Sequence, residues 1–145
     1  MTQVPYLIQA WVNTGGGIPG VGYEGERHDV RFVFRIHPPG AAEFVMLYVK
    51  TLHGMEYVPL DAFEYSDPFR IVNPIADWLA AHFPYGMFSV DVMRDAGGAW
   101  FLTELNDQVG LSIDFENQVE IHEMTRFMQL YIEDMKKVLR HSKKH

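Results

Sequence analysis

Residues 88–111 read FSVDVMRDAGGAWFLTELNDQVGL, and this stretch decides the fold that we expect. Two apolar runs on either side of Gly97 and Gly98 predict a β-hairpin. Asp91 nevertheless lies inside the first run, and Glu104 and Asn106 lie inside the second. Because strand side chains alternate between faces, Glu104 and Asn106 share one face. An even number of loop residues would bring Asp91 to that face too, whereas an odd loop or a bulge would separate it.

Two carboxylates on a half-buried face repel each other and stay ionised only beside a compensating charge. A divalent cation is one solution, since carboxylate and amide oxygens are the ligands that Mg²⁺, Mn²⁺ and Ca²⁺ prefer. An ion pair is the other solution, because Arg31, Lys50 or Arg94 could neutralise the acids without a metal. The spacing of the residues leaves both interpretations open.

The sequence around the hairpin predicts the rest of a sheet. Apolar or alternating runs indicate strands at 6–12, 28–36 and 43–51, and a short extended piece follows at 56–60. In the strand at 28–36, Val30, Phe32, Phe34 and Ile36 form an apolar face, and Asp29, Arg31 and Arg35 lie on the opposite, charged face. Residues 13–28 contain six glycines and predict a long loop.

Two helices complete the predicted fold. Asn73 as the N-cap and Pro74 as the first helical residue indicate a helix that ends before residue 84. Apolar residues at helical spacing indicate a long second helix over about residues 116–140. The sequence therefore predicts one α+β domain over residues 1–145, with a mostly antiparallel sheet and both helices packed on one face.

Composition narrows the classes of function. The net charge of −7 argues against a nucleic-acid-binding protein, which would present a basic surface. The sequence has no cysteine, which excludes disulfides and thiolate metal sites and is compatible with the cytoplasm. No stretch approaches the roughly 18 apolar residues of a membrane span, so we expect no membrane partner. The GxGxxG pattern at Gly20, Gly22 and Gly25 precedes a strand rather than a helix, so we do not interpret it as a dinucleotide site.

The pattern of residues 88–111 resembles the closing motif of ATP-grasp enzymes, with an Asp in a strand, a turn, then Glu-x-Asn and a downstream glycine. Three further segments resemble parts of the same family in the same order. YLIQAWV at 6–12 resembles the hinge strand, HDVRFVF at 28–34 the Asp-x-Arg strand, and YVK at 48–50 the next strand with its basic end. The resemblance extends from Tyr6 to about Leu111 and implies the C-terminal lobe of an ATP-grasp fold.

The resemblance implies a role for each matched residue. Asp91, Glu104 and Asn106 would bind Mg²⁺, with Mn²⁺ as an alternative, between the phosphates of ATP. Arg31 and Lys50 would be the catalytic residues beside the phosphates. The hinge residues that would receive the adenine are Ile8, Gln9, Ala10, Trp11 and Val12. The implied reaction converts a small-molecule or peptide carboxylate to an acyl phosphate, which an amine then attacks.

The first lobe of an ATP-grasp unit precedes the hinge strand and does not correspond to any part of this sequence. We therefore expect the missing lobe to come from preceding sequence or from a partner chain, and we expect no activity from this lobe alone. Surfaces left uncovered by that lobe also predict a homo-oligomer. Two alternatives remain open, which are a non-catalytic nucleotide-binding or assembly module and an ATP-grasp-like kinase that phosphorylates a small molecule.

Overall fold

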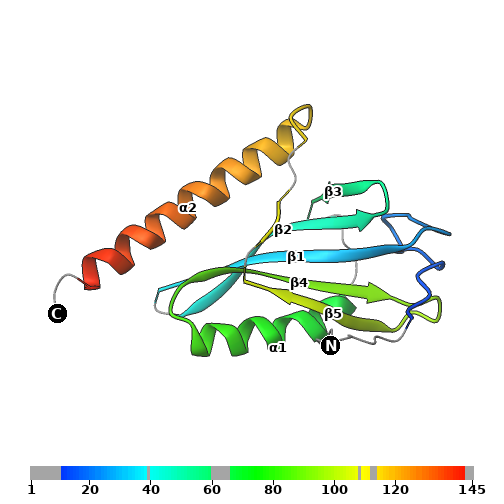
Figure 1. Ribbon diagram of the computed structural model, residues 1–145, viewed down its shortest axis with the longest axis horizontal. Coiled ribbons are helices and arrows are strands. Elements are labelled where there is room, and N and C mark those ends of the chain that lie inside the picture. Colours follow the sequence, from blue (N-terminus) through cyan, green and yellow to red (C-terminus); the bar gives the residue numbers. More distant parts are fainter. Residues whose placement is uncertain (1–10, 39, 60–65, 108, 112–113, 143–145) are drawn as a thin grey trace, which may run out of the picture.

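The computed structural model describes residues 11–38, 40–59, 66–107, 109–111 and 114–142. Its strands form one five-stranded antiparallel sheet in the order β3-β2-β1-β4-β5 (Figure 1). The elements are β1 (His28–His37), β2 (Ala41–Thr51), β3 (Gly54–Val58), α1 (Ser66–His82), β4 (Gly86–Arg94), β5 (Trp100–Asn106) and α2 (Gln118–Ser142). The predicted α+β class, the hairpin and the long C-terminal helix are confirmed.

One face of the sheet packs against α1 and forms the larger hydrophobic core. The apolar face of β1 supplies Phe32 and Phe34, which are fully buried beside Val72 and Leu79 of α1. The ring of Phe32 also meets the ring of Phe69 edge to face, with 5.1 Å between the ring centres. Burial of these large side chains is the main force that holds α1 on the sheet.

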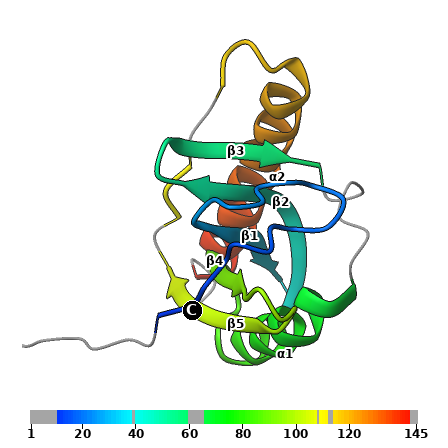
Figure 2. The ribbon, with the colours of Figure 1, turned by 90° about the vertical axis from the view of Figure 1, so that its right-hand side faces the viewer.

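The opposite face packs against α2, so the prediction that both helices cover one face is wrong. Figure 2 shows α1 and α2 on different sides of the sheet. Phe127 of α2 belongs to a second cluster with Val33 and Met46, whose side chains point away from α1. The charged face of β1 is covered because Arg35 pairs there with Asp134 of α2, a residue that is 1% exposed. Ion pairing between distant segments therefore allowed a charged strand face to be buried.

The start of α1 also differs from the prediction. The helix begins at Ser66, and Pro74 lies inside it rather than at its first turn. A proline removes one backbone donor and usually disrupts a helix interior. Asn73 and Pro74 lie on the exposed side of α1, while Val72 and Ala76 are buried against the sheet. Packing of the buried side thus outweighs the proline, which faces solvent.

The predicted strand at 6–12 falls mostly outside the described residues, and its last two residues, Trp11 and Val12, are not in a strand.

The side chain of Asn117 caps the N-terminus of α2 by accepting hydrogen bonds from the backbone N–H groups of Val119 and Glu120. No helix in the described ranges is both long enough and apolar enough to cross a membrane.

Candidate functional site

Arg31 of β1 and Asp91 of β4 are register partners on the α2 side of the sheet. Arg31 donates from Nε to Oδ1 of Asp91 at 2.8 Å and from Nη2 to Oδ2 at 2.7 Å. Its remaining terminal nitrogen, Nη1, donates to the carbonyl oxygen of Gly110 at 3.0 Å. This two-pronged geometry fixes the plane of a carboxylate that is completely buried.

Lys50 joins the same cluster from β2, on the other side of β1. Its Nζ donates to Oδ2 of Asp91 at 2.7 Å and to Oδ2 of Asp29 at 2.9 Å. Asp29 is the register partner of Lys50, so the lysine side chain reaches past β1 to its second acceptor. The two residues predicted to be catalytic, Arg31 and Lys50, therefore lie together, and both contact the predicted metal ligand Asp91.

Glu104 of β5 lies directly opposite Asp91, although the hairpin has neither an even loop nor a regular register. Arg94 pairs with Trp100, which leaves a loop of residues 95–99, and a bulge then shifts the register between Asp91 and Val92. The two irregularities cancel, so Asp91 and Glu104 meet on one face. The hydroxyl of Thr103 stabilises the bulge by donating to the carbonyl oxygen of Asp91 at 2.9 Å.

The side chain of Glu104 differs from that of Asp91 in its surroundings. It is 55% exposed, and its Oε2 lies 3.9 Å from Nη2 of Arg31. Among the described residues, the three carboxylates of Asp29, Asp91 and Glu104 thus pair with two cations, Arg31 and Lys50. The cluster carries one excess negative charge, and that charge faces solvent at Glu104.

Asn106, the third predicted ligand, lies one alternation further along β5, opposite Ser89. Its Nδ2 and the hydroxyl oxygen of Ser89 are both buried, and neither has a hydrogen-bond partner among the described residues. A half-turn of the amide would place Oδ1 where Nδ2 now lies. The amide is therefore not committed to another protein group at that position.

The charges of the cluster reinforce one another. Burial alone would raise the pKa of Asp91, but hydrogen bonds from Arg31 and Lys50 outweigh burial and hold the pKa below its usual value. The hydrogen bond to Asp91 raises the pKa of Arg31 against the opposing effect of burial. Burial would lower the pKa of Lys50, yet its bonds to Asp91 and Asp29 raise it. These contacts thus favour the ionised form of Asp91 although its side chain is fully buried from solvent.

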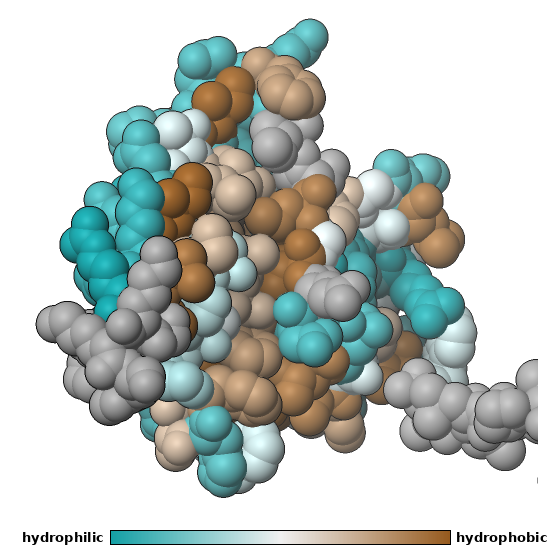
Figure 3. Space-filling view, turned by 60° about the vertical axis from the view of Figure 1, so that its left-hand side comes forward, coloured by the Kyte–Doolittle hydropathy of each residue, from teal (hydrophilic) through white to brown (hydrophobic). Residues whose placement is uncertain are grey.

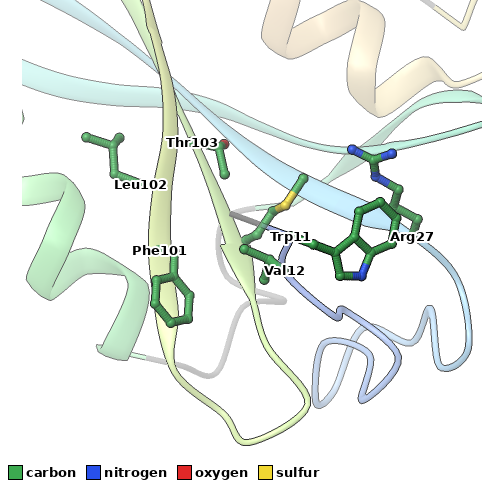
Figure 4. A pocket seen from close by; sticks show the side chains of 7 residues that line it. Trp11, Val12, Arg27, Phe101, Leu102 and Thr103 are labelled. Carbon is green, nitrogen blue, oxygen red and sulfur yellow. The ribbon is translucent and has the colours of Figure 1, made fainter. Parts of the chain in front are cut away.

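An apolar pocket of about 360 Å³ opens beside this cluster (Figure 4). The residues that line it are Trp11, Val12, Arg27, Met93, Phe101, Leu102 and Thr103. The guanidinium of Arg27 lies over the indole of Trp11 at 4.8 Å, a cation–π contact at the mouth of the pocket. Of the predicted hinge residues, Trp11 and Val12 line the pocket, whereas Ile8, Gln9 and Ala10 lie outside the described residues.

A second cavity of about 190 Å³ shares Arg27 and Met93 with the pocket and is also lined by Asp29 and Lys50. The charged cluster therefore borders this second cavity through Asp29 and Lys50.

His28 lies in the wall of the second cavity and is almost completely buried. Its Nδ1 contacts the carbonyl oxygen of Glu26 at 3.0 Å, while Nε2 has no hydrogen-bond partner among the described residues. Burial lowers the pKa of His28 against the opposing effect of that contact, so the ring favours its neutral form.

The glycine-rich loop of residues 13–27 leads into strand β1 rather than into a helix, as expected.

Sequence reasoning did not find several residues of the site. Arg27 belongs to no motif, and only the folded loop of residues 13–27 carries it to Trp11. Met93 and Phe101 looked like ordinary apolar members of the hairpin, yet they are register partners that line the pocket. Alternation along the two strands could have indicated that Met93 and Phe101 share a face of the sheet. It could not have indicated that a pocket lies over this part of the face.

Asp91, Glu104 and Asn106 offer the oxygen ligands that a hard divalent cation prefers, and they lie on adjacent strands. Both oxygens of Asp91, however, already accept hydrogen bonds from Arg31 and Lys50. Within the described ranges, no three His, Cys, Asp or Glu side chains are grouped closely enough to hold a metal ion by themselves. A cation here would therefore need the amide and oxygens from a bound phosphate as further ligands.

Comparisons of the chain with protein-family models, with curated proteins and with solved structures found no match.

Proposed function

We propose that this chain is the C-terminal lobe of an ATP-grasp ligase, which binds ATP and Mg²⁺ and activates a carboxylate. The observation that carries the proposal is the convergence of Asp91, Glu104 and Asn106 on one sheet face beside Arg31 and Lys50. The apolar pocket that begins at Trp11 supports it, since an adenine needs an apolar slot next to the charges that bind its phosphates.

Glu104 and Asn106 are the residues that would hold Mg²⁺ together with Asp91, and Mn²⁺ suits the same ligands. The bound ion would neutralise charge on the phosphate oxygens and act as a Lewis acid. Arg31 contributes by holding the Asp91 carboxylate in one orientation through two hydrogen bonds. This preorganisation avoids the cost of ordering a buried ligand each time that nucleotide binds.

Lys50 and Arg27 both line the second cavity and provide positive charge there. In the proposed reaction, an oxygen of the substrate carboxylate attacks the terminal phosphorus of ATP, and the bond to ADP breaks. An amine then attacks the carbonyl carbon of the acyl phosphate, inorganic phosphate leaves, and the amine loses a proton. The cations favour the first step because they offset negative charge on the transferring phosphoryl group.

The proposal includes a partner and a location. A first lobe, from preceding sequence or from a partner chain, would close the nucleotide site over the α2 side of the sheet. The reaction consumes ATP, so we place the protein in the cytoplasm. The substrate would be a small-molecule or peptide carboxylate.

Calorimetric titration of the full chain with ADP, with and without Mg²⁺, tests the proposal. We expect ADP to bind at least about tenfold more tightly with Mg²⁺ present. Glu104→Gln should remove most of that difference, because it removes one negative charge from a ligand that is already solvent-exposed. Glu116→Gln is the matched control, since Glu116 is exposed and lies outside the cluster. An affinity for ADP that is the same with and without Mg²⁺ would contradict the proposal. A loss of the Mg²⁺ effect in Glu116→Gln as large as in Glu104→Gln would also contradict it.

A second candidate function is a nucleotide-binding or assembly module without catalysis. It is favoured by the completeness of the Asp91 ion pairs, because Arg31 and Lys50 already occupy both carboxylate oxygens. Such a module would bind ADP equally well with and without Mg²⁺. The same titration therefore separates the two candidates.

A further inference from the structure

Strand β5 lies at one edge of the sheet in the part of the chain that the structure describes. Alternate residues of an edge strand point their backbone N–H and C=O groups away from the sheet, where another strand can pair with them. The side chains of Phe101, Leu102 and Leu105 in β5 are 44%, 50% and 45% exposed. Figure 3 shows hydrophobic atoms in the lower part of the molecule, the part in which Figure 1 places β5 and α1. An apolar edge of this kind can accept a further strand.

The exposed apolar side chains of β5 lie on both faces of the sheet. Leu105 is opposite Val90, a residue of the core under α1. Phe101 is opposite Met93. Because positions 90 and 93 of β4 are an odd number of residues apart, these two pairs lie on opposite faces. A strand that completes this edge therefore needs apolar side chains on both of its own faces.

The other edge of the sheet is better protected against further pairing. There β3 has only five residues, and Tyr23 of the loop at residues 13–27 donates its hydroxyl to the carboxylate of Glu56. Short edge strands and charged side chains are common protections of sheet edges. In contrast, β5 has seven residues, of which Glu104 alone is charged.

The chain itself leads to this edge. The carbonyl oxygen of Asn13 accepts a hydrogen bond from the backbone N–H of Ala96 in the hairpin loop, at 2.8 Å. Trp11 and Val12 line one pocket together with residues 101–103 of β5 (Figure 4). From residue 13 back to residue 11, the chain thus passes from the hairpin loop to the start of β5. Its direction is therefore opposite to that of β5.

We propose that residues 6–10, which precede the described part of the chain, form a sixth strand that pairs antiparallel with β5. Their sequence, YLIQA, has no charged residue, and the consecutive apolar side chains at positions 6–8 supply both faces of a strand. At about 3.3 Å per residue, five residues extend over about 17 Å, enough to pair with most of β5. Pro5 has no backbone donor, so the pairing ends there. The proposal does not depend on nucleotide binding.

NMR spectroscopy of the full chain tests the pairing. We expect nuclear Overhauser contacts between the α-protons of residues 6–10 and those of residues 102–106, with numbers that rise in one strand as they fall in the other. We also expect slow amide hydrogen exchange at successive residues of β5, because the outward N–H groups would be bonded too. Absence of these contacts would overturn the proposal. Contacts that arise only between a labelled and an unlabelled copy would also overturn it, because a second copy would then occupy the edge.

A charge placed in the segment tests the apolar match. Ile8→Asp should speed amide exchange in β5 at least about tenfold, because it brings a carboxylate against an apolar edge. Thr2→Asp is the matched control, since it adds the same charge on the other side of Pro5. The amides of β3 report on the sheet as a whole and should keep their rates in both variants. The proposal fails if β5 exchanges at the same rate in Ile8→Asp as in the wild type, if Thr2→Asp has an equal effect, or if β3 is accelerated as much as β5.

Discussion

Arg31 holds both carboxylate oxygens of Asp91 across the β1–β4 pair, at 2.8 and 2.7 Å. Lys50 adds a third hydrogen bond to the same carboxylate from β2. One buried acid is therefore bonded to two neighbouring strands of the sheet in addition to its own. This contact therefore contributes to the stability of the sheet and also fixes the orientation of a residue of the candidate site.

Arg31→Ala should destabilise the fold strongly. The substitution removes the two hydrogen bonds from Arg31 to the completely buried carboxylate of Asp91, and of its two cationic partners in the described part of the chain Lys50 remains. Removal of one member of a buried ion pair costs about 3–5 kcal/mol. Urea unfolding measures the loss. Arg126→Ala is the control, because Arg126 is half-exposed and pairs with Glu43 at 3.6 Å and with Glu123 at 3.3 Å. Surface pairs of this kind are worth about 0–1 kcal/mol each. Equal losses in the two variants would contradict the role given to Arg31.

Acid should destabilise the protein in part through Asp91. The pKa of this carboxyl in the folded state is lower than its ordinary value of 3.8, so the unfolded chain binds a proton first as the pH falls. The stabilisation is complete above the ordinary value and is lost as the pH falls through the folded-state pKa. Asp91→Asn should flatten the acid limb of the free energy of unfolding against pH. An acid limb that is as steep in Asp91→Asn as in the wild type would contradict this role of Asp91.

Asp134 should anchor α2 to the sheet. Its buried carboxylate accepts a hydrogen bond from Arg35 of β1 and one from Lys137 at 3.1 Å. Asp134→Ala should cost about 1–3 kcal/mol and should speed amide hydrogen exchange in α2 more than in α1. Lys137→Ala removes the more exposed of these two partners of Asp134 and should speed exchange in α2 less than Asp134→Ala does. Uniform acceleration over both helices would show that Asp134 supports the whole fold rather than α2.

The sequence predicted the shared face of Glu104 and Asn106, because alternation along one strand is a local property. It placed Asp91 on that face only for an even loop without a bulge, whereas Asp91 reaches the face through an odd loop and a bulge. It did not predict the bulge at Thr103, since a bulge depends on how the loop at residues 95–99 closes. It also missed that α2 covers the charged face of β1. Besides Glu43 of the neighbouring strand, Arg35 pairs with Asp134, which lies 99 residues further along the chain. Contacts over such separations leave no periodic signal in either segment.

Trp11 should contribute to nucleotide binding through the wall of the pocket. Trp11→Ala removes the aromatic surface on which Arg27 rests. Loss of a stacking contact of about 1–3 kcal/mol would weaken ADP binding roughly tenfold or more. Isothermal titration measures the change. Trp78→Ala is the control, because Trp78 is an exposed tryptophan of α1 that stacks on His82. The pocket assignment fails if both variants bind ADP like the wild type.

The central claim is that Asp91, Glu104 and Asn106 hold a divalent cation together with nucleotide phosphates. Paramagnetic broadening of amide NMR signals by Mn²⁺ in the presence of ADP tests it most directly, because broadening falls steeply with distance from the ion. The account predicts that signals of residues 90–92 and 103–107 broaden first and that signals of α1 remain sharp. Broadening that spreads over exposed acids such as Glu116, and spares β4 and β5, would contradict it.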